Sequence, residues 1–173
     1  MTASDIFIAF GDNLLESSTS DAFDQLLLQL LLKASQDKRF VCEEADKALH
    51  TLVRYTPPLP LLQKLRVYVS HANFRVRAKS AVFISDCISK MGLEGMKEFG
   101  LGSLVQIAAD SLKDRLPEAR KSARCMVTSI YEAFTGDEEQ KNPELSDMEI
   151  WQKICSTNLP PIQVQALVKI ISS

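Results

Sequence analysis

The sequence predicts an all-α fold, an α-solenoid of about four antiparallel helix pairs. Helix-favouring Leu, Ala, Lys, Glu and Gln are frequent, and no stretch sustains the alternation of apolar and polar residues typical of a half-buried strand. One column of four segments holds a small residue, at Ala48, Ala81, Ala123 and Ala166. Their spacings of 33, 42 and 43 residues are typical of solenoid repeats, in which each helix pair stacks on its neighbours. An irregular α bundle is the alternative.

Turn-forming and helix-breaking residues divide the chain into segments of about 12–20 residues, an ordinary length for globular helices. Pro60, Pro117 and Pro161 stand where a fixed φ and a missing N–H suit the first helical turn. Ser20 and Ser146 offer side-chain oxygens to the free amides at two other helix starts. The expected helices cover 21–33, 39–55, 59–70, 74–91, 101–113, 117–134, 146–156 and 161–172, with a further short helix near 4–15.

The chain is expected to form one domain preceded by a short segment. A folded chain of 173 residues buries roughly 70% of the surface that its unfolded form exposes, so it needs neither a metal nor disulfides for stability. Residues 1–20 form the N-terminal segment and residues 21–173 the repeat domain. Gly92 suits the end of the second pair. The four pairs cover about 21–55, 59–91, 101–134 and 146–172.

No catalytic or metal chemistry is expected. The four cysteines form no CxxC or CxxH pair, so zinc-ligand spacing is absent and reduced thiols are expected. His50 and His71 have no second ligand at helical spacing. No phosphate-binding glycine motif occurs, and Ser80 and Ser122 recur in a KSA unit, which indicates architecture rather than a nucleophile. We therefore predict no enzyme, no cofactor and no small-molecule substrate.

Charge and hydropathy exclude two further classes of partner. The formal net charge of −2 argues against a nucleic-acid binder, whose affinity depends on neutralising phosphates. The apolar run IFIAF near the start has no basic residue before it, unlike a signal peptide. The run LLLQLLL, from Leu26 to Leu32, is far shorter than the roughly 20 residues that span a membrane. A cytoplasmic protein without membrane contact is expected.

Three predicted second helices, RFVCEEADKALHTLV, FRVRAKSAVFISDCI and LPEARKSARCMVTSI, resemble the second helix of HEAT repeats. Arg77 and Ala81 match its V-R-x-x-A pattern, and Ala48 and Ala123 match it in part. More narrowly, residues 36–134 resemble the C-terminal half of TOG domains, the tubulin-binding HEAT arrays of the CLASP, crescerin and microtubule-polymerase families. The resemblance rests on DKRFVCEEADKAL, HANFRVRAKSA and DRLPEARKSAR in that order.

The resemblance implies a non-catalytic module that binds a protein, tubulin first, through the turns inside its helix pairs, and an association with the cytoskeleton. TOG domains usually place an exposed Trp in the first turn of six repeats, whereas Trp151 lies in the last predicted pair beside Met148 and Ile154, which suggests packing. The chain therefore resembles half of such a domain. The implied partner-binding residues, which we call the turn surface, are Lys38, Arg39, Asn73, Phe74, Arg75, Arg115, Arg120 and Lys121.

Each of these features has an alternative interpretation. The basic residues of the turns are either exposed to a partner or paired with acids such as Glu43, Glu44, Asp114 and Glu118, and exposed pairs contribute only about 0–1 kcal/mol. Three apolar residues near the turns are either exposed anchors or staples that close a helix pair: Phe40, Phe74 and Leu116. The alternative function is a general HEAT-repeat scaffold that docks another protein, or self-associates, through helix faces such as LLLQLLL.

Overall fold

The computed structural model describes residues 2–10, 20–136 and 145–173, and within these ranges the chain is all-helical, with no strand. The expected all-α class is therefore confirmed. The helices are α1 (Ala3–Phe10), α2 (Ser20–Ala34), α3 (Arg39–Tyr55), α4 (Pro58–Leu65), the 3₁₀ helix η1 (Arg66–Ser70), α5 (Phe74–Phe99), α6 (Leu101–Leu112), α7 (Pro117–Thr135), α8 (Asp147–Asn158) and α9 (Pro161–Ser172). The helix expected near 4–15 is present as α1 up to Phe10, and the rest of the expected range lies outside the described residues.

Local sequence signals account for most helix starts. Ser146 and Glu149 form a reciprocal capping box at the start of α8, as the Ser146 signal predicts. Pro117 and Pro161 occupy the first positions of α7 and α9, where their missing N–H costs nothing. Pro60 was expected to do the same for α4, but that helix begins at Pro58, because two prolines precede Pro60 in one turn. Proline therefore marks these starts to within two residues.

The backbone confirms the predicted helix end near Met91, at the close of the second pair. Gly92 leaves the helical conformation, with φ 69° and ψ 179°, yet helix resumes at once and α5 runs on to Phe99. Only glycine adopts this region of φ and ψ without strain, so Gly92 produces a kink inside the element. The continuation is anchored because Met96 is fully buried and Phe99 packs against the core. Gly92 therefore ends one helical segment, and the buried residues beyond it hold the next segment against the core.

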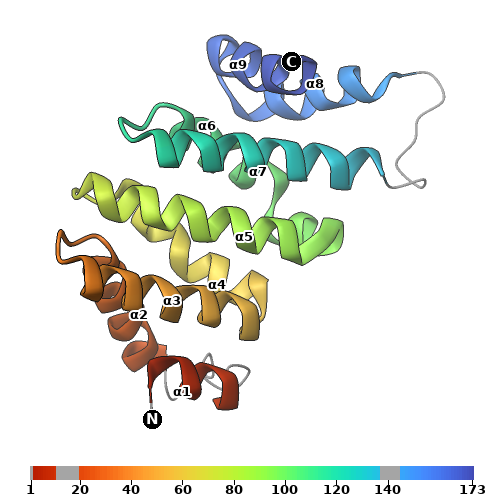
Figure 1. Ribbon diagram of the computed structural model, residues 1–173. Helices are drawn as coiled ribbons and strands as arrows, with labels where there is room; N and C mark the ends of the chain where they lie inside the picture. The colour runs from red at the N-terminus through yellow and green to blue at the C-terminus, as the bar shows by residue number, and fades with distance from the viewer. Residues whose placement is uncertain (1, 11–19, 137–144) are drawn as a thin grey trace.

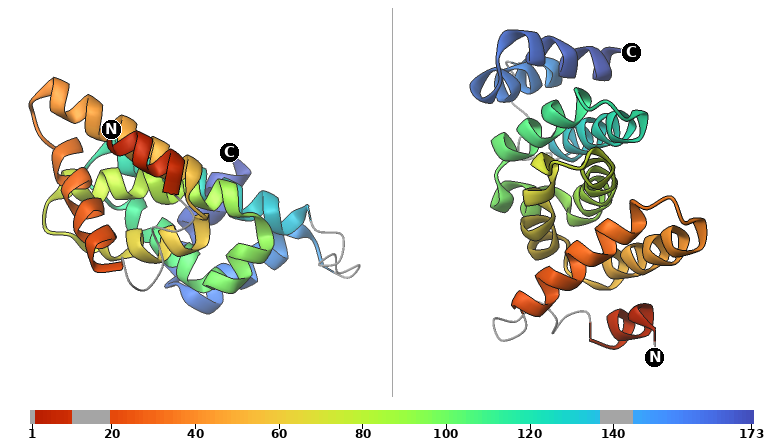
Figure 2. Two further views of the ribbon diagram at one scale, coloured as in Figure 1. Left: turned by 90° about the horizontal axis from the view of Figure 1, so that it is seen from below. Right: turned by 90° about the vertical axis from the view of Figure 1, so that its left-hand side faces the viewer.

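Consecutive helices pack in pairs, and the pairs follow one another along the molecule (Figure 1). The helices α2 and α3, α4 and α5, α6 and α7, and α8 and α9 contact each other. Between pairs, α3 contacts α5, α5 contacts α7, and α7 contacts α9. On the other side of the molecule, η1 contacts α6, and α6 contacts α8 (Figure 2). The short helix α1 packs on α3. One contiguous apolar core runs between these helices.

The small-residue column and Trp151 were both expected to pack between helices. Ala48, Ala81 and Ala123 of the small-residue column are buried between helices, as expected, but Ala166 in α9 is exposed. Ala166 lies where α9 borders a hollow instead of a packed neighbour. Trp151 is fully buried and meets the edge of the Tyr131 ring at a centroid distance of 5.8 Å, which confirms its packing role.

The run LLLQLLL in α2 is largely inside the molecule. Leu27 and Leu31 are fully buried, Leu26 and Leu30 pack on the core, and Gln29 is exposed. This burial agrees with a helix packed between neighbours rather than with a face left open. Across the described ranges, no helix is long and apolar enough to cross a bilayer.

Candidate functional site

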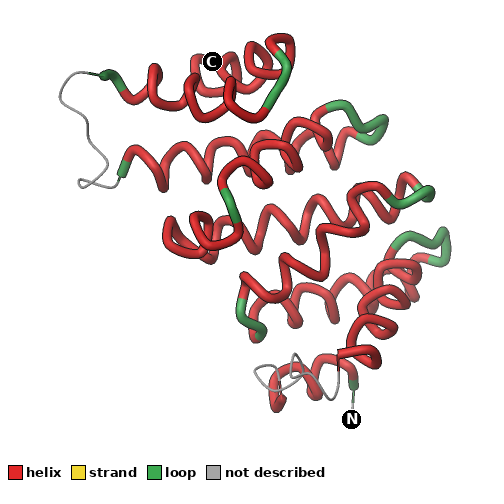
Figure 3. The backbone as a smooth tube through the Cα atoms, turned by 180° about the vertical axis from the view of Figure 1, so that it is seen from behind, coloured by secondary structure: helices red, strands yellow, loops and turns green. Residues whose placement is uncertain are grey.

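Three turns lie along one edge of the molecule, between α2 and α3, between η1 and α5, and between α6 and α7 (Figure 3). Arginines of α5 tie these turns together. The Arg75 guanidinium contacts the Asp37 carboxylate and donates to the Ser35 carbonyl at 3.3 Å, in the first turn. The Arg77 guanidinium donates to the Asp114 carboxylate at 2.9 Å, in the third turn. The three turns therefore form one continuous row.

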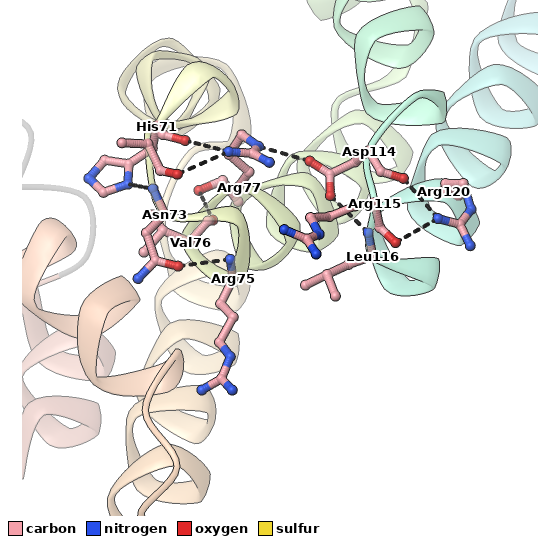
Figure 4. A network of polar contacts seen from close by, with 11 residues as sticks. His71, Asn73, Arg75, Val76, Arg77, Asp114, Arg115, Leu116 and Arg120 are labelled. Atoms are coloured by element: carbon pink, nitrogen blue, oxygen red, sulfur yellow. Dashed lines mark hydrogen bonds and ion pairs between the residues drawn. The ribbon is translucent and has the colours of Figure 1, made fainter.

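Arg77 holds its own turn as well as the next one (Figure 4). Its Nη1 donates to the carbonyl oxygens of His71 at 2.9 Å and Ala72 at 3.2 Å, while its Nε donates to Asp114. Asp114 in turn accepts the backbone N–H of Leu116 at 3.0 Å. The side chains of Arg77 and Asp114 are only 26% and 8% exposed, so this pair is largely shielded from solvent.

The contacts of Asp114 keep it charged. Burial by itself favours the neutral acid and so acts to raise its pKa, but the N–H of Leu116 and the Arg77 guanidinium outweigh burial. The pKa of Asp114 therefore lies below its ordinary value. At neutral pH the side chain is a carboxylate fixed between two turns.

Arg120 repeats the Arg77 arrangement one helix pair later. Each is the fourth residue of its helix, and the Arg120 Nη1 donates to the carbonyls of Asp114 at 2.8 Å and Arg115 at 2.9 Å (Figure 4). Cys42 takes the same position in α3, and its Sγ lies 2.9 Å from the Ala34 carbonyl. Arg120 was expected to contact a partner, and its turn-closing role was not expected from the sequence. A donor at the fourth position of α3, α5 and α7 is the signal that reveals it.

Three more residues of the predicted turn surface are engaged within the chain. Arg39 pairs with Glu43 at 2.7 Å on an exposed face. Asn73 caps α5, because its Oδ1 accepts the N–H of Arg75 at 2.9 Å. Arg75 pairs with Asp37. These contacts favour the alternative in which basic residues pair with neighbouring acids, as Arg77 also does.

Four residues of the turn surface or its border remain directed outward. Lys38 and Lys121 are exposed and have no ion-pair partner in the described part of the chain. Arg115 is exposed and its guanidinium lies 4.8 Å from the centre of the Phe74 ring, a cation–π arrangement. Phe40 is 76% exposed and is therefore no staple. We call Lys38, Phe40, Arg115 and Lys121 the outward cluster.

Leu116 behaves differently from Phe40, although both lie beside a turn. Leu116 packs against the core and serves as a staple for its helix pair. Phe74 is half-buried beneath Arg115. The structure thus separates the three apolar candidates into one exposed side chain, one staple and one support for a cation.

The histidines and buried cysteines of the described residues lie apart from one another. His71 Nδ1 accepts the N–H of Asn73 at 3.1 Å, and His50 lies 3.8 Å from Asp46 and 3.9 Å from Asp86. Burial raises the pKa of the Cys87 and Cys155 thiols to about 12, which suppresses their thiolates at neutral pH. Within the described residues, no three potential metal ligands lie close enough together to hold an ion.

Comparisons with protein-family models, with curated proteins and with solved structures find no match to this chain.

Proposed function

We propose that this chain is a non-catalytic protein-binding module, an α-solenoid of HEAT-like antiparallel pairs that presents its turns to an acidic protein surface. Two features support the proposal. Consecutive pairs contact each other through equivalent helices, and Arg77 and Arg120 close successive turns in the same way. Repeated units that contact only their neighbours are characteristic of solenoids.

The observation that carries the proposal is the row of tied turns. Because Arg75 and Arg77 link each turn to the next, the turns are held in fixed relative positions before a partner arrives. A rigid surface loses little conformational entropy on binding, so small contacts at several turns add to the affinity. The row therefore suits recognition of an extended protein surface.

The outward cluster defines the chemistry of the partner. Lys38, Arg115 and Lys121 offer positive charge, and Phe40 offers an exposed aromatic ring. Arginine and aromatic side chains are enriched in protein interfaces, where they contribute much of the binding energy. An acidic protein surface with an apolar contact for Phe40 fits this cluster. The TOG resemblance makes tubulin the first candidate, with fewer turns than a full array and no exposed Trp.

The test is binding to unpolymerised tubulin dimer, measured by size-exclusion chromatography with light scattering and by fluorescence anisotropy at low and physiological salt. We expect a complex that weakens with added salt, because exposed charges are screened. The variant Lys38→Glu/Arg115→Glu should lower the affinity about tenfold or more, a cost of about 1.4 kcal/mol. The matched variant Arg54→Glu/Lys153→Glu changes the net charge equally at exposed helix positions and should bind like the wild type.

Equal affinity of the two double variants for tubulin would show that the outward cluster does not contact it. No complex at low salt would contradict tubulin as the partner. Circular dichroism and thermal unfolding of both variants check that the fold is retained, as expected for exposed positions.

A further inference from the structure

A second surface lies in a groove where α9 borders α6 and α7, beside the turn between α6 and α7. The groove has a volume of about 680 Å³. Figure 1 shows α9 at the C-terminal end of the row of helices, next to α7. Ala109 and Leu112 from α6 and Ala166 and Ile170 from α9 are among the residues that line it. The groove is therefore mainly apolar along its length.

The apolar lining is open to solvent. Ile162, at the start of α9, is 82% exposed, and Ala166, one helical turn later, is exposed as well. These residues lie on one face of α9 together with Lys169 and Ile170, at the spacing of a helical stripe. Because removing apolar surface from water is favourable, exposed apolar residues along a groove indicate a surface that a partner can cover.

The charged side chains that line the groove have a single sign. Lys113, Arg124 and Lys169 line it, and no Asp or Glu side chain of the described residues does. Lys113 reaches only Asp110, at 3.9 Å on its own helix, while Arg124 and Lys169 have no ion-pair partner within the described ranges. The chain as a whole carries a net charge of −2, so this concentration of cations is local. It complements a ligand that carries carboxylates.

We propose that this groove binds an amphipathic helical segment of a partner protein, with Leu or Ile on one face and Asp or Glu on its flanks. The 12 residues of α9 extend about 18 Å, which matches about three turns of a partner helix. Apolar residues at i, i+3, i+4 and i+7 enter such a groove, and flanking carboxylates reach the three cations. The apolar lining favours this occupant over a phosphate or nucleic acid, which offers nothing to bury there.

The probe is a labelled, hydrocarbon-stapled helical peptide of about 14 residues with a Leu face and a Glu face. We expect saturable binding in fluorescence anisotropy to the full chain. Ala166→Glu, which places a carboxylate in the groove, should weaken binding at least tenfold, whereas Gln165→Glu, an exposed neighbour on α9 outside the groove, should not. Lys169→Glu should weaken binding similarly, and the charge-matched Lys153→Glu on α8 should have no effect.

Two control peptides separate the contributions of apolar and charged contacts. A peptide with Ser in place of Leu, and one with Lys in place of Glu, should each lose at least tenfold in affinity. The proposal is overturned if the Leu–Glu peptide does not bind, if the Ser peptide binds equally well, or if Ala166→Glu and Gln165→Glu behave alike. A dimer of the wild type that Ala166→Glu dissociates would also overturn it, since a second copy would then occupy the groove.

This inference is independent of the proposed tubulin binding. The variant Lys38→Glu/Arg115→Glu leaves every residue of the groove unchanged and should bind the peptide like the wild type. Ala166→Glu, conversely, leaves the outward cluster unchanged. Failure of one surface in these assays is therefore distinguishable from failure of the other.

Discussion

Replacing Arg77 with methionine tests whether the tied turns stabilise the fold. Methionine keeps much of the side-chain volume but removes three hydrogen bonds, to Asp114 and to the carbonyls of His71 and Ala72. Asp114, with a side chain that is 8% exposed, then keeps its charge without its main partner. The variant removes the link between the second and third turns and leaves the apolar core in place.

The expected loss follows from the burial of the pair. Hydrogen bonds to charged groups contribute about 1.5–3 kcal/mol each, and removing one partner of a buried ion pair costs about 3–5 kcal/mol. Because Arg77 is 26% exposed, water partly replaces the lost contacts. We therefore expect Arg77→Met to lower the free energy of unfolding by about 3 kcal/mol and the Tm by about 6–12 °C.

Urea unfolding followed by circular dichroism at pH 7 measures this loss. Lys121→Met, at an exposed position without an ion-pair partner in the described part of α7, is the matched control and should change stability by less than about 0.5 kcal/mol. Combining Arg77→Met with Asp114→Asn should give a smaller loss than the sum of the single variants, because the two residues contact each other. If Arg77→Met is as stable as Lys121→Met, the reasoning is refuted.

The pH dependence gives an independent check. The lowered pKa of Asp114 means that its ionised form is favoured in the folded state, so its contribution is complete above the unfolded pKa and is lost as the pH falls through the folded pKa. The wild type should therefore lose more stability than Arg77→Met as the pH falls from 5 to below about 3. Identical slopes for the two proteins would show that Arg77 does not control the ionisation of Asp114.

Three further predictions concern positions away from the turns. Lys90→Met should lower the free energy of unfolding in urea by about 1–2 kcal/mol, because the Lys90 ammonium group donates to three carbonyls at the end of α3, those of Val53, Arg54 and Thr56. A loss of stability no larger than that of Lys153→Met would contradict this helix-capping role. Gly92→Ala should cost about 1–3 kcal/mol, since φ is 69° and ψ is 179° there. Gly95→Ala, in the helical part of α5, should cost less, because the gain in helix propensity offsets the close approach of the new methyl group to the Met91 side chain; equal losses would argue against the kink. In alkylation by iodoacetamide at pH 8, exposed Cys125 should react first. Cys87 and Cys155, whose thiols have pKa values of about 12, should react only when the protein unfolds. A reaction of the folded protein that persists unchanged in Cys125→Ser would refute this order.

The candidate site was only partly predictable. The sequence identifies which turns carry basic residues, but Arg75, Arg77 and Arg120 look equivalent to Lys38 and Arg115 in a linear chain. Arg75 and Arg77 differ because they reach carboxylates about 40 residues away, Asp37 and Asp114. Arg120 differs because it donates to the carbonyls of its own turn. Exposure of Phe40 and burial of Leu116 likewise follow from the neighbouring helices.

The sequence by itself determined the helical class and nearly all of the helix starts. These properties depend on interactions within a few residues, such as the capping box at Ser146 and the restricted φ of Pro117 and Pro161. Such interactions are set by local spacing alone, so they are legible without knowledge of the fold.

Only the tertiary structure decided which cations are internal and where apolar surface stays open. Burial of Met96 holds the segment after Gly92 against the core, and a distant carboxylate fixes Arg77. Ala166 differs from Ala48, Ala81 and Ala123 only in its neighbours, since α9 borders a groove where the others meet packed helices. Burial and ion pairing are sums over residues distant in the chain, and these sums exist only once the helices have packed.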